Sequence, residues 1–383
     1  MVYFNHNREK CEEVRVNHKY INKERYKNMT IQIEKLTNAI TVSGILLSAD
    51  VRSMELEMED KETGNKVKRP VVSGRLEIIT KIDEETGSKS TETVEIFANK
   101  YTKNGTLNSA VETLEEILGG IKTNEEIKAL KKKDPNYKNK VVIYDKSDNE
   151  PKKYYCSVWN SNKQYAPKFN VNRYVSQNEI KKNVRISGGN LTIKPFEEDR
   201  HKLYCDFELD CIVRNIQEEL DREGNPTGRA ILTVFAPVMN QKELDGVELK
   251  MYAGILPALE EGQEEVDLGS AFLDEVQEQD CMKIFGTMEN SVRVIENKIE
   301  CKFGRPRVEK RTEYKNEYII TGADFLDEDT FEVEDIRDLL KSISMKEQEM
   351  LEQSEEQSDE PIRSTARGLG AKPNSSKRRN GFF

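Results

Sequence analysis

The stretch ITVSGILLSADVRSMELEME, residues 40–59, decides the fold class of this 383-residue chain. Near its end, apolar Met54, Leu56 and Met58 alternate with glutamates. A period of two indicates a β-strand with one buried face. Two more strands are predicted downstream, VVSGRLEIITKI (71–82) and TVEIFANKY (93–101). A glycine inside the first of these indicates a bulge or a sharp coil of the sheet.

The period then changes in residues 102–120, TKNGTLNSAVETLEEILGG, where apolar residues fall at helical spacing. Ser109 and Glu112 suggest a capping box, and Gly119 is placed to end the helix. A lysine-rich connector (128–140) and two short strands, VVIY and YYCSVW, follow. Three coiled strands, a helix and further strands are the order of an OB-fold, a small Greek-key barrel.

A second unit repeats this plan, with NVRISGGNLTI (183–193) as its opening strand and LYCDFELDCIV (203–213) as an alternating strand. We therefore expect a mainly β protein with a few helices, built as tandem OB-like Greek-key barrels. The predicted parts are a charged N-terminal extension (1–28), β-domain 1 (29–175), β-domain 2 (176–322), an acidic helical segment (323–351) and a flexible tail (352–383).

Composition excludes several classes of function. No apolar run approaches the ~20 residues of a membrane span, and the N-terminus lacks an apolar signal core, so we expect a cytoplasmic location, the host cytoplasm if the protein is viral. Six cysteines lack CxxC spacing and three histidines lie far apart, which predicts reduced thiols and no metal site. Phosphate-loop, GxSxG and HExxH motifs are missing, so no enzyme and no cofactor are predicted.

One segment, KKYYCSVWNSNKQYAPKFNVNRY (152–174), has no acidic residue although the chain has a net charge of -10. Bare bases stack on aromatic rings for ~1–3 kcal/mol each, while lysine and arginine follow the phosphates. Trp159 and Tyr165 are the strongest candidates, because they lie in or beside a polar loop. The alternative is a strand whose core face holds Tyr154, Cys156 and Val158. The candidate nucleic-acid-binding residues are Lys152, Lys153, Trp159, Lys163, Tyr165, Lys168, Phe169, Arg173 and Tyr174.

A second basic and aromatic segment, KFGRPRVEKRTEYKNEY (302–318), adds Arg305, Arg307, Lys310 and Arg311 as candidates. The alternative for this segment is an edge strand kept soluble by its charge. At the end of the chain, Phe382 and Phe383 are apolar without a folding reason, so they are predicted to bind partner proteins.

Glycine-punctured coiled strands, a helix before the closing strands, an aromatic–basic loop and an acidic tail ending in phenylalanine resemble phage-type single-stranded-DNA-binding proteins of OB-fold type. The resemblance implies binding of single-stranded DNA in phage DNA replication or recombination, with RNA as the alternative ligand. It also implies that replication or recombination proteins bind the C-terminal tail. The chain departs from the family where basic residues from Arg363 to Arg379 precede the final phenylalanines, and these suggest an extra nucleic-acid arm. The remaining alternatives are a β-rich structural or assembly protein of a virion and a polymerase-accessory or RNA-binding protein.

Overall fold

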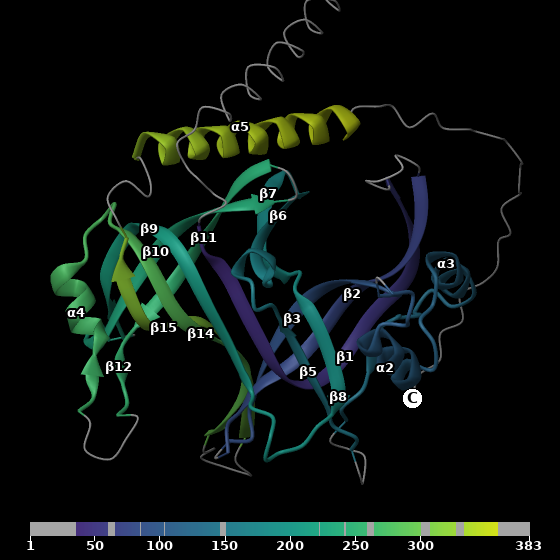
Figure 1. Cartoon of the computed structure of the whole chain (residues 1–383). Coiled ribbons are helices and arrows are strands. Elements are labelled where there is room, and N and C mark those ends of the chain that lie inside the picture. The colour runs from purple at the N-terminus through teal and green to yellow at the C-terminus, as the bar shows by residue number, and fades with distance from the viewer. Residues whose placement is uncertain are drawn as a thin grey trace, which may run out of the picture.

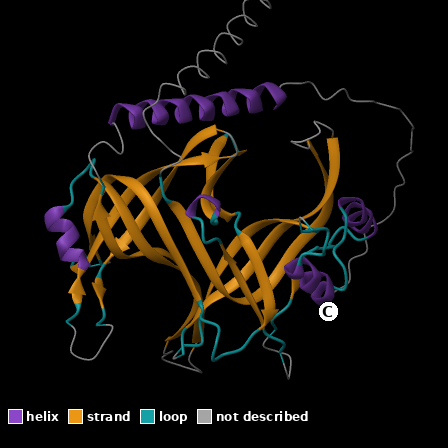
Figure 2. Ribbon diagram, in the orientation of Figure 1, coloured by secondary structure: helices purple, strands orange, loops and turns teal. Residues whose placement is uncertain are grey.

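The fold is mainly β with a few helices, and most strands belong to one 13-stranded sheet (Figures 1 and 2). This computed structural model describes residues 36–59, 66–84, 86–102, 104–145, 151–221, 223–240, 243–258, 264–299, 307–326 and 333–358. The predicted N-terminal extension and the tail beyond residue 358 lie outside these ranges. The elements are β1 (Asn38–Glu59), β2 (Lys66–Ile82), β3 (Lys89–Asn99), α2 (Ser109–Leu118), α3 (Asn124–Lys133), β4 (Val141–Val142), β5 (Tyr154–Trp159), η2 (Lys163–Tyr165), β6 (Lys168–Ser176), β7 (Glu179–Ser187), β8 (Asn190–Pro195), β9 (Tyr204–Leu220), β10 (Pro226–Asn240), β11 (Glu243–Ala253), β12 (Ile255–Leu256), β13 (Val266–Asp267), α4 (Leu268–Glu275), β14 (Cys281–Ile299), β15 (Arg307–Phe325) and α5 (Val333–Ser358).

The first barrel begins as an antiparallel meander of β1, β2 and β3. β3 then pairs in parallel with β7, while β8 pairs with β5, and β5 returns to β1. Gly188 and Gly189 both have positive φ, so β7 and β8 act as one strand with a bend between them. With α2 between the third and fourth strands, this is the five-stranded Greek-key barrel of the OB-fold.

Close approach of β1 and β2 explains the two glycines of this hairpin. A Cβ on Gly44 would lie 1.9 Å from the carbonyl oxygen of Ile79, and one on Gly74 would lie 2.1 Å from that of Asp50. Only glycine permits such backbone contact without a shift of the strands. The tight coil of the first barrel is therefore built on these positions.

The second barrel repeats the topology. β9, β10 and β11 form the meander, β11 pairs in parallel with β15, and β14 pairs with both β15 and β9. α4 again lies between the third and fourth strands. The tandem OB-like architecture expected from the sequence is thus present.

The boundary between the barrels differs from the predicted one. Residues 183–193, which were expected to open the second unit, instead close the first barrel through the pairing of β7 with β3 and of β8 with β5. Strand pairing therefore places the end of the first barrel at Pro195, beyond the predicted boundary at residue 175, and the second barrel starts at Tyr204. A glycine-interrupted strand opens one barrel and closes another equally well, because only its hydrogen-bond partners distinguish the two roles.

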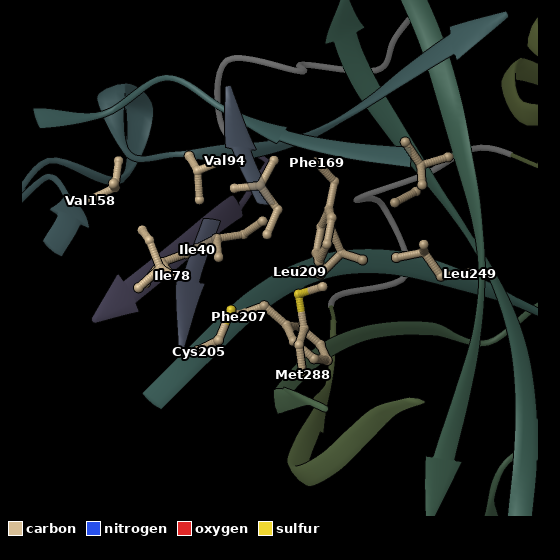
Figure 3. Packing of buried hydrophobic residues seen from close by; sticks show 14 of the residues in the cluster. Ile40, Ile78, Val94, Val158, Phe169, Cys205, Phe207, Leu209, Leu249 and Met288 are labelled. Atoms are coloured by element: carbon tan, nitrogen blue, oxygen red, sulfur yellow. The ribbon is translucent and has the colours of Figure 1, made fainter. Parts of the chain in front are cut away.

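The two barrels share one hydrophobic core (Figure 3). The first part of β1 pairs with β9, and this pairing joins the strands of the two barrels into one continuous sheet. Between the barrels, Phe169, Phe207 and Tyr318 meet edge to face, with ring centroids 5.7–6.1 Å apart. Such aromatic contacts fix the relative placement of the barrels by close packing as well as by strand pairing.

The helices lie outside the sheet (Figure 2). The predicted helix is present as α2, but its N-cap is Asn108, whose side chain accepts a hydrogen bond from Ala110 N. Gly119 ends it with φ 65°. The predicted lysine-rich connector is wrong for its first part, because α3 occupies Asn124–Lys133 and starts with a capping box of Thr123 and Glu126.

Helix α5 lies across both barrels (Figure 1). As its period predicts, Ile336, Leu339 and Ile343 are buried, and they pack on Ile212 and Phe235 of the second barrel. The helix runs to Ser358, so the first residues of the predicted flexible tail are helical.

Candidate nucleic-acid interface

The segment 152–174 folds as β5, η2 and β6, with a loop in its middle. Trp159 ends β5 and is 42% exposed, and Tyr165 ends η2 and is 62% exposed. Both rings are therefore available to a ligand. Phe169 is fully buried in the shared core, which excludes it as a stacking platform for bases.

The loop between β5 and β6 lies over a surface that carries carboxylates. It lines a cavity of about 560 Å³ together with Asp206 and Glu208. Lys163 forms an ion pair with Glu208, which also lies 3.4 Å from Lys283. Because the cations here are already matched by carboxylates, this loop presents rings without a clear excess of positive charge.

Other cations of the segment are also engaged. Arg173 is largely buried, with Nη1 2.7 Å from Asp245 and Nε 2.6 Å from Glu347 of α5, so its predicted phosphate contact is replaced by a structural ion pair. Lys153 pairs with Glu198 at 2.6 Å. Burial lowers the pKa of the Lys168 ammonium, which is only partly exposed. Lys152 remains an exposed cation.

The second predicted segment is partly described. Arg307 begins β15, and Lys310 and Arg311 are exposed on the same strand. Arg305, and the partner-binding Phe382 and Phe383, lie outside the described residues.

A surface that the sequence did not single out lies on the outward side of β1, β2 and β3. Arg52, Ser73 and Phe97 stand beside one another in strand register, and Phe97 is 51% exposed next to the small serine. One pair further along β2 and β3, exposed Arg75 pairs with Glu95. These residues form what we call the β2–β3 face, which combines an exposed aromatic ring with arginines on the two strands beside it.

An ion-pair chain extends this face onto the β6–β7 hairpin. Glu95 Oε1 accepts hydrogen bonds from Arg75 Nε at 3.0 Å and from Arg185 Nη1 of β7 at 2.9 Å. Alternation along the strands puts the Tyr174–Lys181 pair on the same side of the hairpin as Arg185. Tyr174, which is 46% exposed, is thus a predicted site residue on the side of the hairpin that continues from Arg185.

More positive charge flanks the face. α3 lies beside the second half of β1, where Ser53 N donates to Lys122 O at 2.9 Å. Its last turn consists of three consecutive lysines, all exposed. Figure 1 shows the β1–β2 and β6–β7 hairpins projecting on the same side of the barrel, with α5 beyond them. In an OB-fold, the face of strands 2 and 3 and the loops 1–2 and 4–5 bind oligonucleotides, and these elements correspond to β2, β3 and the two hairpins.

The described residues hold neither a metal-ligand group nor a membrane-spanning helix. Within these ranges there is no group of three His, Cys, Asp or Glu side chains placed to hold a metal ion. Nor, in the same part of the chain, is any helix long and apolar enough to cross a membrane.

Fold and site together define a tandem OB-type β protein with an aromatic–basic face. The chain belongs to the YorF family, whose model matches residues 37–357. No curated protein matches the chain. Among solved structures it is similar to the single-stranded DNA binding protein from Thermus aquaticus, with 9% identity, a TM-score of 0.35 and coverage of 76% of this chain and 94% of that one. A deletion mutant of the same protein gives 10% identity, a TM-score of 0.35 and coverage of 76% and 96%. The fold assignment rests on the strand pairing of this chain, not on that likeness.

Proposed function

We propose that this protein binds single-stranded nucleic acid, primarily single-stranded DNA, without catalysing a reaction. The observation that carries the proposal is Phe97, exposed on the outward face of an OB-type barrel, in one register row with Arg52 across Ser73 and with Arg75 on the neighbouring strand. A ring in this place stacks on a base of any identity, and guanidinium groups beside it contact the flanking phosphates.

The charges of the face support this ligand. Arg75 and Arg185 share the carboxylate of Glu95, and the exposed Asp50 stands in register with Arg75. With Arg52 included, the face has three arginines and two carboxylates, an excess of one positive charge. The lysines at the end of α3 add further cations nearby. A net negative chain binds a polyanion when the local potential is positive, because the local field steers the ligand.

A place in DNA replication or recombination is part of the same proposal. A protein that coats a strand by stacking and phosphate contact holds it extended and unpaired, which both processes require. Binding of partner proteins by Phe382 and Phe383 stays a prediction from the sequence.

Fluorescence anisotropy tests the proposed function, with labelled oligo-dT, an RNA of matching length and duplex DNA, each at low and moderate salt. We expect the tightest binding for oligo-dT and a steep loss of affinity with salt, since released counterions drive phosphate contacts. Absence of binding to all three ligands would refute the proposal and favour a structural or assembly role. Preference for RNA would assign the protein to the RNA-binding alternative.

A further inference from the structure

A second cavity, of about 500 Å³, lies where the two barrels meet. Its walls are the β2–β3 turn of the first barrel, the end of β11, and the paired parts of β14 and β15 in the second barrel. The β2–β3 turn contributes Lys81 and Ser88, while the second barrel contributes Tyr252, Tyr314 and Lys315. The cavity therefore combines two aromatic rings with polar side chains.

Tyr252 holds a position that matches the β2–β3 face of the first barrel. In the first barrel the parallel pair of strands 3 and 5 contains Glu95, which is held by Arg75 from strand 2. In the second barrel the parallel pair of β11 and β15 contains Tyr252. Arg229 belongs to β10, and its Cζ lies 4.6 Å from the centroid of the Tyr252 ring. Both barrels thus place an arginine of strand 2 against the junction of strands 3 and 5.

The lining of this cavity carries the carboxylates of Asp83, Glu289 and Glu317 and the ammonium groups of Lys81 and Lys315. It therefore has no excess of positive charge, unlike the β2–β3 face. Glu289 pairs with both Lys81 and Lys315, the latter at 3.1 Å. Glu317 accepts from Arg229 at 2.9 Å. Because each cation already has a carboxylate partner, phosphate would have to displace an ion pair to bind here. The rings and the hydroxyl, amide and carboxylate groups suit the uncharged base of a nucleotide better.

We propose that this cavity holds a nucleobase of the strand bound by the first barrel, stacked on Tyr314, since the Tyr252 ring is already covered by Arg229 and Lys250. Carboxylates accept hydrogen bonds from exocyclic amino groups, as they do from the cytosine amino group in DNA grooves. The cavity contributes affinity through stacking, and its contribution does not depend on salt. This inference rests on the proposed function and adds a second point of contact in the second barrel.

Substitution of Tyr314 tests the cavity, because this residue is 77% exposed and its loss leaves the core intact. The ligand is a mixed-sequence single strand of about 35 nucleotides, longer than the combined footprint of two OB-folds at ~4–16 nucleotides each. We expect Tyr314→Ala to lower affinity roughly 5- to 100-fold, the loss of one stacked base, and to leave the slope of log affinity against log salt unchanged. Tyr314→Phe keeps the ring and should bind like the wild type.

Each outcome separates this inference from the proposed function. Failure of the wild-type protein to bind any single strand would overturn both. Wild-type binding with an unchanged affinity of Tyr314→Ala would overturn the cavity alone. A lower affinity with a shallower salt slope would also overturn it, since the lost contact would then be to phosphate.

Discussion

Removal of the Phe97 ring should lower the affinity for single-stranded DNA without lowering the stability of the fold. The ring is half exposed on the outward side of the sheet, so Phe97→Ala should unfold at nearly the same temperature as the wild type. One stacked base is worth ~1–3 kcal/mol, so the affinity for oligo-dT should fall roughly 5- to 100-fold. Salt dependence should not change, because Arg52 and Arg75 remain.

The assay is fluorescence anisotropy at fixed salt, with thermal unfolding of each variant as the test of folding. Phe97→Trp retains an aromatic face and is the matched control, which should bind at least as well as the wild type. Trp159→Ala is the second control, because it removes an exposed ring from the loop beside Asp206 and Glu208. If Phe97→Ala binds normally and Trp159→Ala does not, the β2–β3 face is not the interface and the loop is.

Three further predictions concern stability. Phe169→Ala opens a cavity in the shared core and should cost ~3–5 kcal/mol in urea unfolding, whereas a loss within 1 kcal/mol of zero would contradict its burial. Arg173→Ala removes the largely buried cation that pairs with Asp245 and Glu347, and although Lys182 still lies 3.1 Å from Glu347, Asp245 loses its partner, so we expect a loss of ~3–5 kcal/mol in urea unfolding. Burial raises the pKa of Glu92 to about 7 despite a hydrogen bond from Asn290, so the folded protein holds a proton that the unfolded chain releases. The free energy of unfolding therefore includes a contribution from protonated Glu92 that is complete below pH 4.5 and is lost as the pH rises through 7, by up to about 3 kcal/mol. Glu92→Gln should flatten the curve of stability against pH in this range.

Local sequence patterns predicted much of the secondary structure. Alternation in residues 40–59 and 203–213 predicted strands that are present as β1 and β9, and helical spacing predicted α2. The helical period around Leu339 predicted the buried side of α5. Each of these patterns involves residues that are close in sequence, so it can be recognised without knowing which strands or helices pack together.

The candidate site was harder to predict. Phe169 and Arg173 share a basic, aromatic segment with Trp159, yet one is core and the other is a buried ion pair. The local sequence cannot show that these two residues are buried and Trp159 is exposed, because the groups that cover them, Phe207 and Asp245, come from the second barrel. Phe97 was missed for the converse reason, since its ring looks like a core residue until the register shows which side of the sheet it occupies.

The sequence by itself determined the fold class, the positions of most strands and helices, and the balance of charge, because period, capping and composition are local properties. Tertiary structure alone decided that Gly188 and Gly189 bend a closing strand instead of opening a barrel. It also decided that Arg52, Arg75, Phe97 and Arg185 lie on one face, through strand register and the parallel pairing of β3 with β7. Both features depend on hydrogen bonds between strands that are distant in sequence, and the local sequence of a strand does not indicate which strand it will pair with.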